Sequence, residues 1–151
     1  MMRIMFVCHG NICRSPMAEF IMKKLVKDNG LEQEFVIASS ATSTEEIGNP
    51  VYPSAKRELA KHGISCEGKY SVQLEREDYQ KYDLFIVMDE HNLYNICRIF
   101  PWDPENKIHK LMEYAGSSAD IADPWYNEKF EKAYQDIYAG CCGLLEKIKH
   151  E

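Results

Sequence analysis

Close to its amino terminus the chain runs Arg3-Ile4-Met5-Phe6-Val7-Cys8-His9-Gly10-Asn11-Ile12-Cys13-Arg14-Ser15-Pro16. Residues 3–7 form a short, mostly apolar run, which predicts a buried strand. Pro16 suits the first turn of a helix, and a helical pattern continues from it to residue 29, just before Gly30. The polar residues 8–15 therefore form a loop between the first strand and the first helix.

The same alternation of strand and helix patterns continues along the chain. Residues 35–38 and 84–88 predict two further strands, and residues 53–62, 90–99 and 127–149 predict helices. Strands that are apolar throughout are typical of a parallel sheet with helices on both faces. We therefore expect an α/β fold, and a length of 151 residues suits a single domain spanning residues 1–151.

The last predicted helix carries an apolar stripe at helical spacing. Its members are Phe130, Tyr134, Ile137, Cys141, Leu144 and Ile148. Gly140 and Gly143 interrupt the helix. Each glycine is expected to weaken it by about 1 kcal/mol relative to alanine.

Charge and hydropathy exclude several classes of function. A formal net charge of −6 makes the chain a poor candidate for binding nucleic acid or an anionic membrane. No apolar run approaches the length of about 20 residues that spans a bilayer, and the first residues do not form a signal peptide. We expect a cytoplasmic protein, in which the six cysteines are free thiols, catalytic groups or metal ligands rather than disulfides.

The loop of residues 8–15 has the composition of a phosphate-binding site with a cysteine nucleophile. Backbone amides at a helix N-terminus bind anionic oxygens. The same amides favour a thiolate, which is the reactive form of a cysteine. Gly10 permits a positive φ, and Asn11 tolerates the left-handed conformation that a tightly wrapped loop needs.

Two further residues of the loop fit the same chemistry. Arg14 offers a planar fork to two phosphate oxygens. Ser15 falls at the expected N-cap of the helix, where its hydroxyl binds an orphan amide or the sulfur of Cys8. The spacing between Cys8 and Arg14 is weakly specific by itself, whereas the strand, the full loop and the helix together are specific.

With these residues in place, the chain resembles the low molecular weight protein tyrosine phosphatases over essentially its whole length. The resemblance rests on residues 7–16, on the loop containing Ser39, on Met88-Asp89-Glu90 and on Asp123-Pro124-Trp125-Tyr126. It implies a four-stranded parallel sheet flanked by helices on both faces, with a phosphate-binding loop between the first strand and the first helix. It also implies hydrolysis of phosphotyrosine and small aryl phosphates through a phosphocysteine on Cys8, without a metal or other cofactor.

A phenolate leaving group needs a proton, and Asp123 is the candidate donor. The resemblance implies that the aspartate of this Asp-Pro pair acts first as general acid and then as general base. Asp120 is the nearby competitor, but no proline follows it. Asp89 is expected as a helix N-cap, and the resemblance leaves open a role in orienting Arg14.

The expected substrate-binding residues come from two segments. They are His9, Gly10, Asn11, Ile12, Cys13 and Ser15 of the loop, and Trp125 and Tyr126 after Asp123. The two aromatic residues wall a slot for a flat ring. Ile12 resembles the members that act on phosphotyrosine, whereas a branch that acts on phosphoarginine has a threonine there. Glu45 and Glu46 near the pocket should disfavour acidic peptides.

The expected partners follow from this assignment. They are a phosphotyrosine-containing protein substrate, and phosphate and oxyanion inhibitors such as vanadate. We expect no nucleic-acid or membrane partner, and a monomer.

Several residues of the loop have more than one possible role. Cys13 is either a small buried loop residue or, as the family implies, a thiol that forms a reversible disulfide with Cys8. His9 is expected at the rim of the pocket rather than as a base. Cys8 and Cys13 lack a second pair of ligands at zinc-finger spacing, so we expect no metal site.

Two other functions compete. A thiol-linked arsenate reductase shares the fold, but it needs further cysteines to carry a disulfide outward, and Cys66 and Cys97 have no recognisable partner spacing. A phosphotyrosine-binding module would keep the loop and lose the chemistry. The joint presence of Cys8, Arg14 and Asp123 favours the phosphatase over both.

Overall fold

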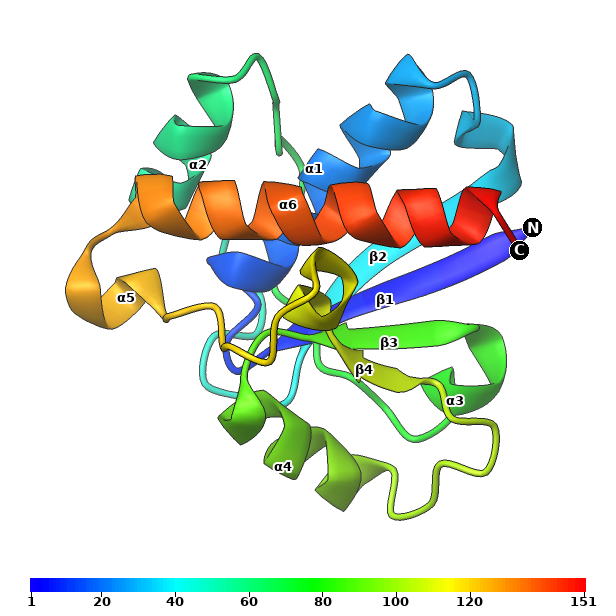
Figure 1. Ribbon diagram of the computed structural model, residues 1–151. Coiled ribbons are helices and arrows are strands. Elements are labelled where there is room, and N and C mark those ends of the chain that lie inside the picture. Colours follow the sequence, from blue (N-terminus) through cyan, green and yellow to red (C-terminus); the bar gives the residue numbers. More distant parts are fainter.

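The computed structural model describes residues 1–151 and is built on one parallel sheet with strand order β2-β1-β3-β4. The strands are β1 (Met2–Cys8), β2 (Phe35–Ala41), β3 (Leu84–Val87) and β4 (Ile108–Lys110). The central strand β1 pairs with β2 from Met2↔Phe35 to Cys8↔Ala41, and with β3 on its other side. The loop that follows Cys8 therefore starts at the middle of the sheet's carboxyl edge (Figure 1).

Helices cover both faces of this sheet, as predicted. One face carries α1 (Arg14–Asp28), α2 (Pro53–Ala60) and α6 (Phe130–Lys149), and the other carries α3 (Asp78–Lys81) and α4 (Glu90–Ile99), as Figure 1 shows. The short helix α5 (Pro124–Asn127) lies beyond the carboxyl edge, whereas both chain termini lie at the opposite edge. No helix is both long enough and apolar enough to cross a membrane.

The side chains of β1 explain why this sheet is buried on both sides. Ile4 and Phe6 belong to the core beneath α1 and α6, and Met5 and Val7 belong to the core beneath α3 and α4. Successive residues of a strand point to opposite faces, so a strand between two helical layers must be apolar at every position. The continuous apolar run of β1 is the sequence signature of this arrangement.

The structure differs from the sequence-based expectation in several elements. The strand β4, the helix α3 and the 3₁₀ turns η1 (Glu32–Glu34) and η2 (Leu111–Ala115) were not located, because elements of three to five residues show no usable periodicity. The predicted helix 127–149 begins later, at Phe130, because Glu128 adopts a left-handed φ of 62° at the end of the short helix α5. The first helix begins at Arg14 rather than at Pro16.

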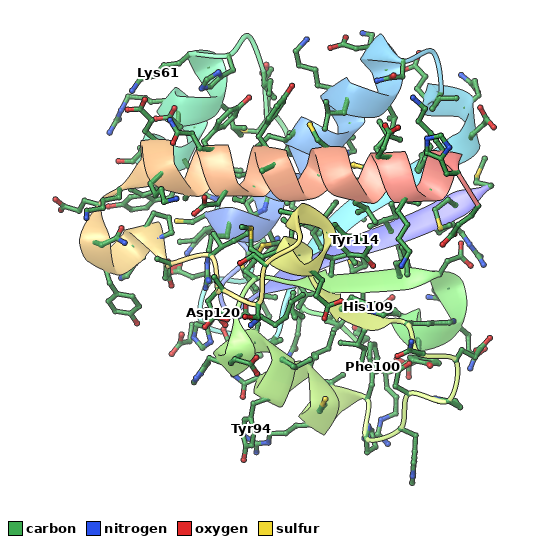
Figure 2. The ribbon with its side chains drawn as sticks, viewed as in Figure 1. Lys61, Tyr94, Phe100, His109, Tyr114 and Asp120 are labelled. Carbon is green, nitrogen blue, oxygen red and sulfur yellow. The ribbon has the colours of Figure 1, made fainter.

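The glycines of α6 allow the helix to approach η2 closely. A Cβ atom built on Gly143 would lie 1.9 Å from the carbonyl oxygen of Tyr114, and one on Gly140 would lie 2.6 Å from Leu111 Cγ. Tyr114 is seen directly beside α6 in Figure 2. The expectation that these glycines only weaken the helix is therefore incomplete, because no larger residue fits the contact.

We predict that Gly143→Ala destabilises the protein although alanine is the better helix former. Overpacking of this kind costs about 1–3 kcal/mol, which outweighs the gain of about 1 kcal/mol in helix propensity. Urea unfolding measures the change. The exposed Ala139, changed to glycine, reports the propensity effect alone; a stabilised Gly143→Ala protein would contradict the close contact.

Candidate active site

The loop between β1 and α1 wraps around the sulfur of Cys8. Asn11 adopts a left-handed φ of 58°, as its side chain type suggested. Gly10 does not adopt a positive φ, so the loop does not use the conformational freedom that a glycine permits there. The N-cap of α1 is Cys13 rather than Ser15, which lies inside the first turn.

Ser15 and Asn11 form a buried polar contact behind Cys8. Ser15 Oγ lies 3.0 Å from Cys8 Sγ. Asn11 Nδ2 donates hydrogen bonds to Ser15 Oγ at 2.7 Å and to Ser39 Oγ at 3.0 Å. Since a hydroxyl oxygen can accept one hydrogen bond and still donate its own proton, Ser15 is free to donate to a Cys8 thiolate.

This polar contact continues from Ser39 on β2 to Glu19 and Lys23 of α1, which sequence reasoning missed together with Lys69. Ser39 Oγ donates to the buried Glu19 Oε1 at 2.5 Å, and Lys23 Nζ donates to Glu19 Oε2 at 2.6 Å. Lys69 Nζ donates to the carbonyl oxygen of Ser39 at 2.8 Å, and burial lowers the pKa of this lysine. A sequence signal was present, because Asn11, Ser15, Glu19 and Lys23 recur at a spacing of four.

Arg14 is almost fully buried and joins three segments of the chain. Its Nη1 donates to Asp89 Oδ2 at 2.7 Å and to the carbonyl oxygen of Ile121 at 2.8 Å. Burial opposes the charge of Arg14, yet Cys8, Asp89 and Asp123 together raise the pKa of its guanidinium. Both hydrogens of Nη1 are engaged, which leaves Nη2 and Nε for two oxygens of an anion.

The two aspartates around Arg14 are both helix N-caps. Asp89 caps α4 and accepts a hydrogen bond from the amide of Asn92 at 2.7 Å while it orients Arg14. Asp123 caps α5, because its Oδ1 accepts from the amide of Trp125 at 3.0 Å. Asp123 Oδ2 lies 3.4 Å from Arg14 Nη2, so this carboxylate is held beside the anion-binding fork.

A pocket of about 140 Å³ opens over Cys8. It is lined by Cys8, His9, Gly10, Ile12, Cys13, Arg14, Glu45, Glu46, Asp123, Trp125 and Tyr126. Nine of the eleven predicted site residues thus share one pocket, whereas Asn11 and Ser15 are buried behind the loop. Glu45 and Glu46 complete the rim.

Two exposed aromatic residues stand at the pocket, and a third supports them. Trp125 and Tyr126 are 47% and 83% exposed, respectively. The ring of Tyr52 meets Trp125 edge to face at a centroid distance of 4.8 Å and stacks on Phe130 at 5.9 Å. The amide of Tyr52 also donates to the carbonyl oxygen of Ile12 at 2.8 Å. Tyr52, for which the sequence indicated no position, therefore connects Trp125 of the aromatic wall to the loop of residues 8–15.

His9 lies at the partly exposed rim of the pocket, whereas Cys13 is buried. His9 Nε2 forms an ion pair with Glu45, which holds the ring at the rim. Cys13 is buried, and burial together with the nearby Cys8 and Asp123 charges raises the pKa of its thiol.

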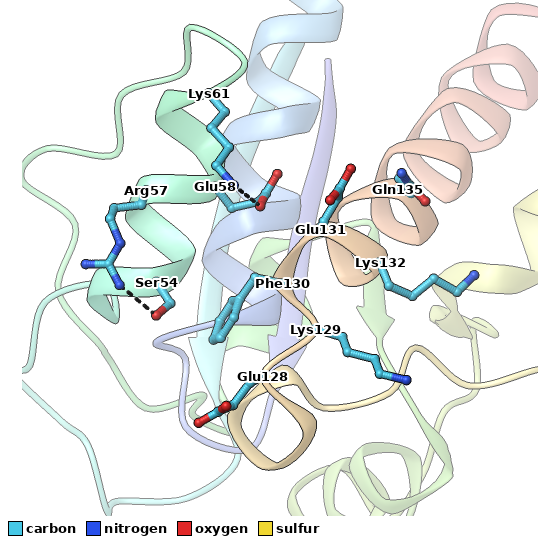
Figure 3. A pocket seen from close by; sticks show the side chains of 10 residues that line it. All are labelled: Ser54, Arg57, Glu58, Lys61, Glu128, Lys129, Phe130, Glu131, Lys132 and Gln135. Carbon is cyan, nitrogen blue, oxygen red and sulfur yellow. Dashed lines mark hydrogen bonds and ion pairs between the residues drawn. The ribbon is translucent and has the colours of Figure 1, made fainter.

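A second, more open hollow lies elsewhere. It is an open groove of about 620 Å³ between α2 and the start of α6, shown in Figure 3. Its lining is mostly charged, and Arg57 and Lys61 bind Ser54 and Glu58 of their own helix. None of the predicted site residues line it, so the small pocket over Cys8 remains the candidate active site.

A sequence model of the family described as low molecular weight phosphotyrosine protein phosphatase matches residues 3–151. The chain belongs to this family. YfkJ, a low molecular weight protein-tyrosine-phosphatase of Bacillus subtilis, is 36% identical over 153 residues, which cover 100% of this chain and 98% of YfkJ. The crystal structure of YfkJ matches with a TM-score of 0.95 and covers 99% of this chain and 96% of that chain.

Two further relatives of this low molecular weight protein-tyrosine-phosphatase are informative. The low molecular weight phosphotyrosine protein phosphatase of Gallus gallus is 41% identical over 149 residues, covering 95% of this chain and 94% of the relative. The structure of Vibrio vulnificus Wzb in complex with benzylphosphonate has a TM-score of 0.85 and 29% identity, and covers 97% of this chain and 98% of that chain.

We predict that Asn11 of this phosphatase is needed for the stability of the loop. Asn11→Ala removes its side-chain hydrogen bonds and leaves alanine in a left-handed conformation, at a cost of about 3 kcal/mol. Asn11→Gly loses the same bonds without the steric cost, and should be more stable than the alanine variant by about 1 kcal/mol. Urea unfolding compares the two, and equal stabilities would contradict the strained backbone.

Proposed function

We propose that this enzyme hydrolyses phosphotyrosine in proteins, and small aryl phosphates, through a phosphocysteine formed on Cys8. The observation that carries the proposal is the convergence of Cys8, Arg14 and Asp123 on one small pocket. A thiol nucleophile, a planar cation and a carboxyl group are the three functions that the cleavage of a phosphate monoester needs.

In the proposed first step, the Cys8 thiolate attacks phosphorus in line with the leaving phenol oxygen. The S–P bond forms as the P–O bond breaks, and Asp123 gives its proton to the phenol oxygen. Loop amides and the free Nη2 and Nε of Arg14 hold the remaining phosphate oxygens. Because Arg14 is already fixed by Asp89 and Ile121, binding does not have to order it.

In the second step, water attacks phosphorus and the Cys8 thiolate leaves. The Asp123 carboxylate takes a proton from this water as the new P–O bond forms, so inorganic phosphate is released and Asp123 is reprotonated for another cycle. Ser15 Oγ, at 3.0 Å from Cys8 Sγ, stabilises the departing thiolate by donating a hydrogen bond.

The aromatic wall supports phosphotyrosine as the substrate. Trp125 and Tyr126 line the pocket with Ile12, so a flat ring finds apolar contact next to the anion site. Benzylphosphonate, in which a methylene group joins a phosphonate to an aromatic ring, is bound by the related Wzb. We further propose that phosphate and vanadate compete for the loop, that residues 1–151 form one monomeric phosphatase domain, and that no metal or other cofactor is required.

We expect hydrolysis of p-nitrophenyl phosphate in the presence of excess chelator. Cys8→Ser should abolish turnover because the alcohol is not ionised at neutral pH, and Asp123→Ala should lower kcat about 10²–10⁴-fold because the phosphocysteine loses the general base for its hydrolysis. Release of nitrophenolate, recorded across the acidic to neutral pH range, measures both. Loss of wild-type activity on chelation would refute the cofactor-free mechanism, and an active Cys8→Ser enzyme would refute the nucleophile.

The acidic rim predicts a preference among phosphopeptides. Glu45 is 68% exposed and lines the pocket with Glu46, so peptides with acidic neighbours are repelled. Changing both residues to glutamine should raise kcat/KM for an acidic phosphopeptide relative to a basic one by about tenfold at low salt, and less at high salt. Glu67→Gln with Glu77→Gln is the matched control on the distant surface; an unchanged peptide ratio in the rim variant would contradict this preference.

A further inference from the structure

A buried lysine at the end of β4 has no place in the mechanism above. Lys110 is only 6% exposed, yet it carries a charge. Its Nζ forms an ion pair with Asp120 Oδ1 at 2.6 Å and donates hydrogen bonds to Glu90 Oε1 at 3.0 Å and to the carbonyl oxygen of Ser118 at 3.1 Å. Three oxygens therefore surround the ammonium group, which compensates the cost of burying its charge.

Two of these three acceptors belong to the segment that leads to Asp123. Residues 117–123 form no helix or strand, so side-chain bonds must fix their path. From outside this segment, only Arg14 and Lys110 bind it through their side chains. Arg14 holds the end near Asp123, and Lys110 holds the middle.

Asp120 connects the segment to α4 as well as to β4. Its Oδ1 accepts a hydrogen bond from the amide of Glu90, the first residue of α4, at 3.1 Å. Figure 2 shows Asp120 on the loop beside the start of α4. The helix α4 is the one whose N-cap, Asp89, orients Arg14. Asp120 therefore fixes the loop to the same helix end that fixes the phosphate clamp.

Ile121, the residue after Asp120, fixes the backbone close to Asp123. Ile121 is fully buried, its amide donates to the carbonyl oxygen of Met88 at 3.0 Å, and its own carbonyl oxygen accepts from Arg14. One residue then separates Ile121 from Asp123. The carboxyl group of Asp123 is thus placed from one side by its cap on α5 and from the other by the two residues 120 and 121.

We propose that Lys110 and Asp120 are positioning residues for proton transfer by Asp123. Their ion pair holds the loop so that the Asp123 carboxyl reaches the leaving oxygen, and the inference rests on the general-acid role proposed above. Because a misplacement of about 1 Å can cost about 100-fold in rate, a loosened loop should impair proton donation before it impairs phosphate binding. Asp120, the competitor of Asp123 in the sequence, then acts through Asp123 rather than in place of it.

Leaving groups of different acidity provide the test. A weakly acidic phenol needs the proton in the transition state, whereas p-nitrophenol leaves without much help. For Asp120→Ala, kcat/KM should fall about ten- to 100-fold with phenyl phosphate and by less than about threefold with p-nitrophenyl phosphate. Lys110→Met should behave alike, and Asp120→Asn should be milder because its amide oxygen still accepts from Glu90.

A matched control separates positioning from general loss of stability. Asp103 precedes the other end of β4, and it accepts hydrogen bonds from the amides of Lys107 and Ile108 at 2.7 and 3.1 Å. Asp103→Ala should destabilise the protein in urea without changing the dependence of kcat/KM on the leaving group. A steeper dependence in Asp103→Ala as well would overturn the proposal, because any loosening of β4 would then suffice.

The double variant decides whether Asp120 acts through Asp123. In an Asp123→Ala background, Asp120→Ala should add no further dependence on the leaving group, since residues that act as a unit are not additive. If Asp120→Ala slows every aryl phosphate equally while Asp123→Ala steepens the dependence, the positioning role fails and the general acid stands. If Asp123→Ala leaves the dependence unchanged, the general-acid role fails and the positioning role with it.

Discussion

The buried guanidinium of Arg14 is bound by groups from two distant parts of the chain. Asp89 arrives from the end of β3, while Ile121 and Asp123 arrive from the loop before α5. A buried charge is tolerated only when it is paired and fully hydrogen-bonded, so these segments cannot move apart without leaving the cation unsatisfied. The stability of the protein and the geometry of its anion site are therefore set by the same contact.

A second polar chain holds the loop from behind. It runs from Cys8 through Ser15, Asn11 and Ser39 to the buried Glu19. Every member bonds to the next, so the network is satisfied inside a core that is otherwise apolar, and such networks specify one conformation. The pocket is accordingly rigid on the side of the nucleophile, whereas its rim at Glu45 and Tyr126 faces solvent. We assign recognition of the phosphate to the rigid side and recognition of the surrounding peptide to the rim.

The parts of this structure that could be predicted from the sequence are those encoded in contiguous residues. The apolar run of β1, the loop after it and the start of α1 lie within residues 2–16, so local pattern and chemistry were sufficient there. Asp123 was found by resemblance, because its proximity to Arg14 is a long-range contact. The sequence also did not indicate the contacts of Glu19, Tyr52 and Lys110, because their partners are far away along the chain. The strand β4 was not predicted because it is too short to show a pattern. Helix propensity alone did not predict the role of Gly143, because the missing side chain leaves room for the backbone of Tyr114.

Both chain termini lie at the edge of the sheet opposite the pocket, as seen in Figure 1. This follows from the parallel sheet, in which β1 starts at one edge and delivers Cys8 to the other, while α6 returns the chain to the starting edge. The consequence is practical. An affinity tag, a fluorescent protein or a solid support can be attached at either terminus without standing in front of the loop after Cys8. The enzyme can thus be immobilised by its ends with its pocket directed towards solution.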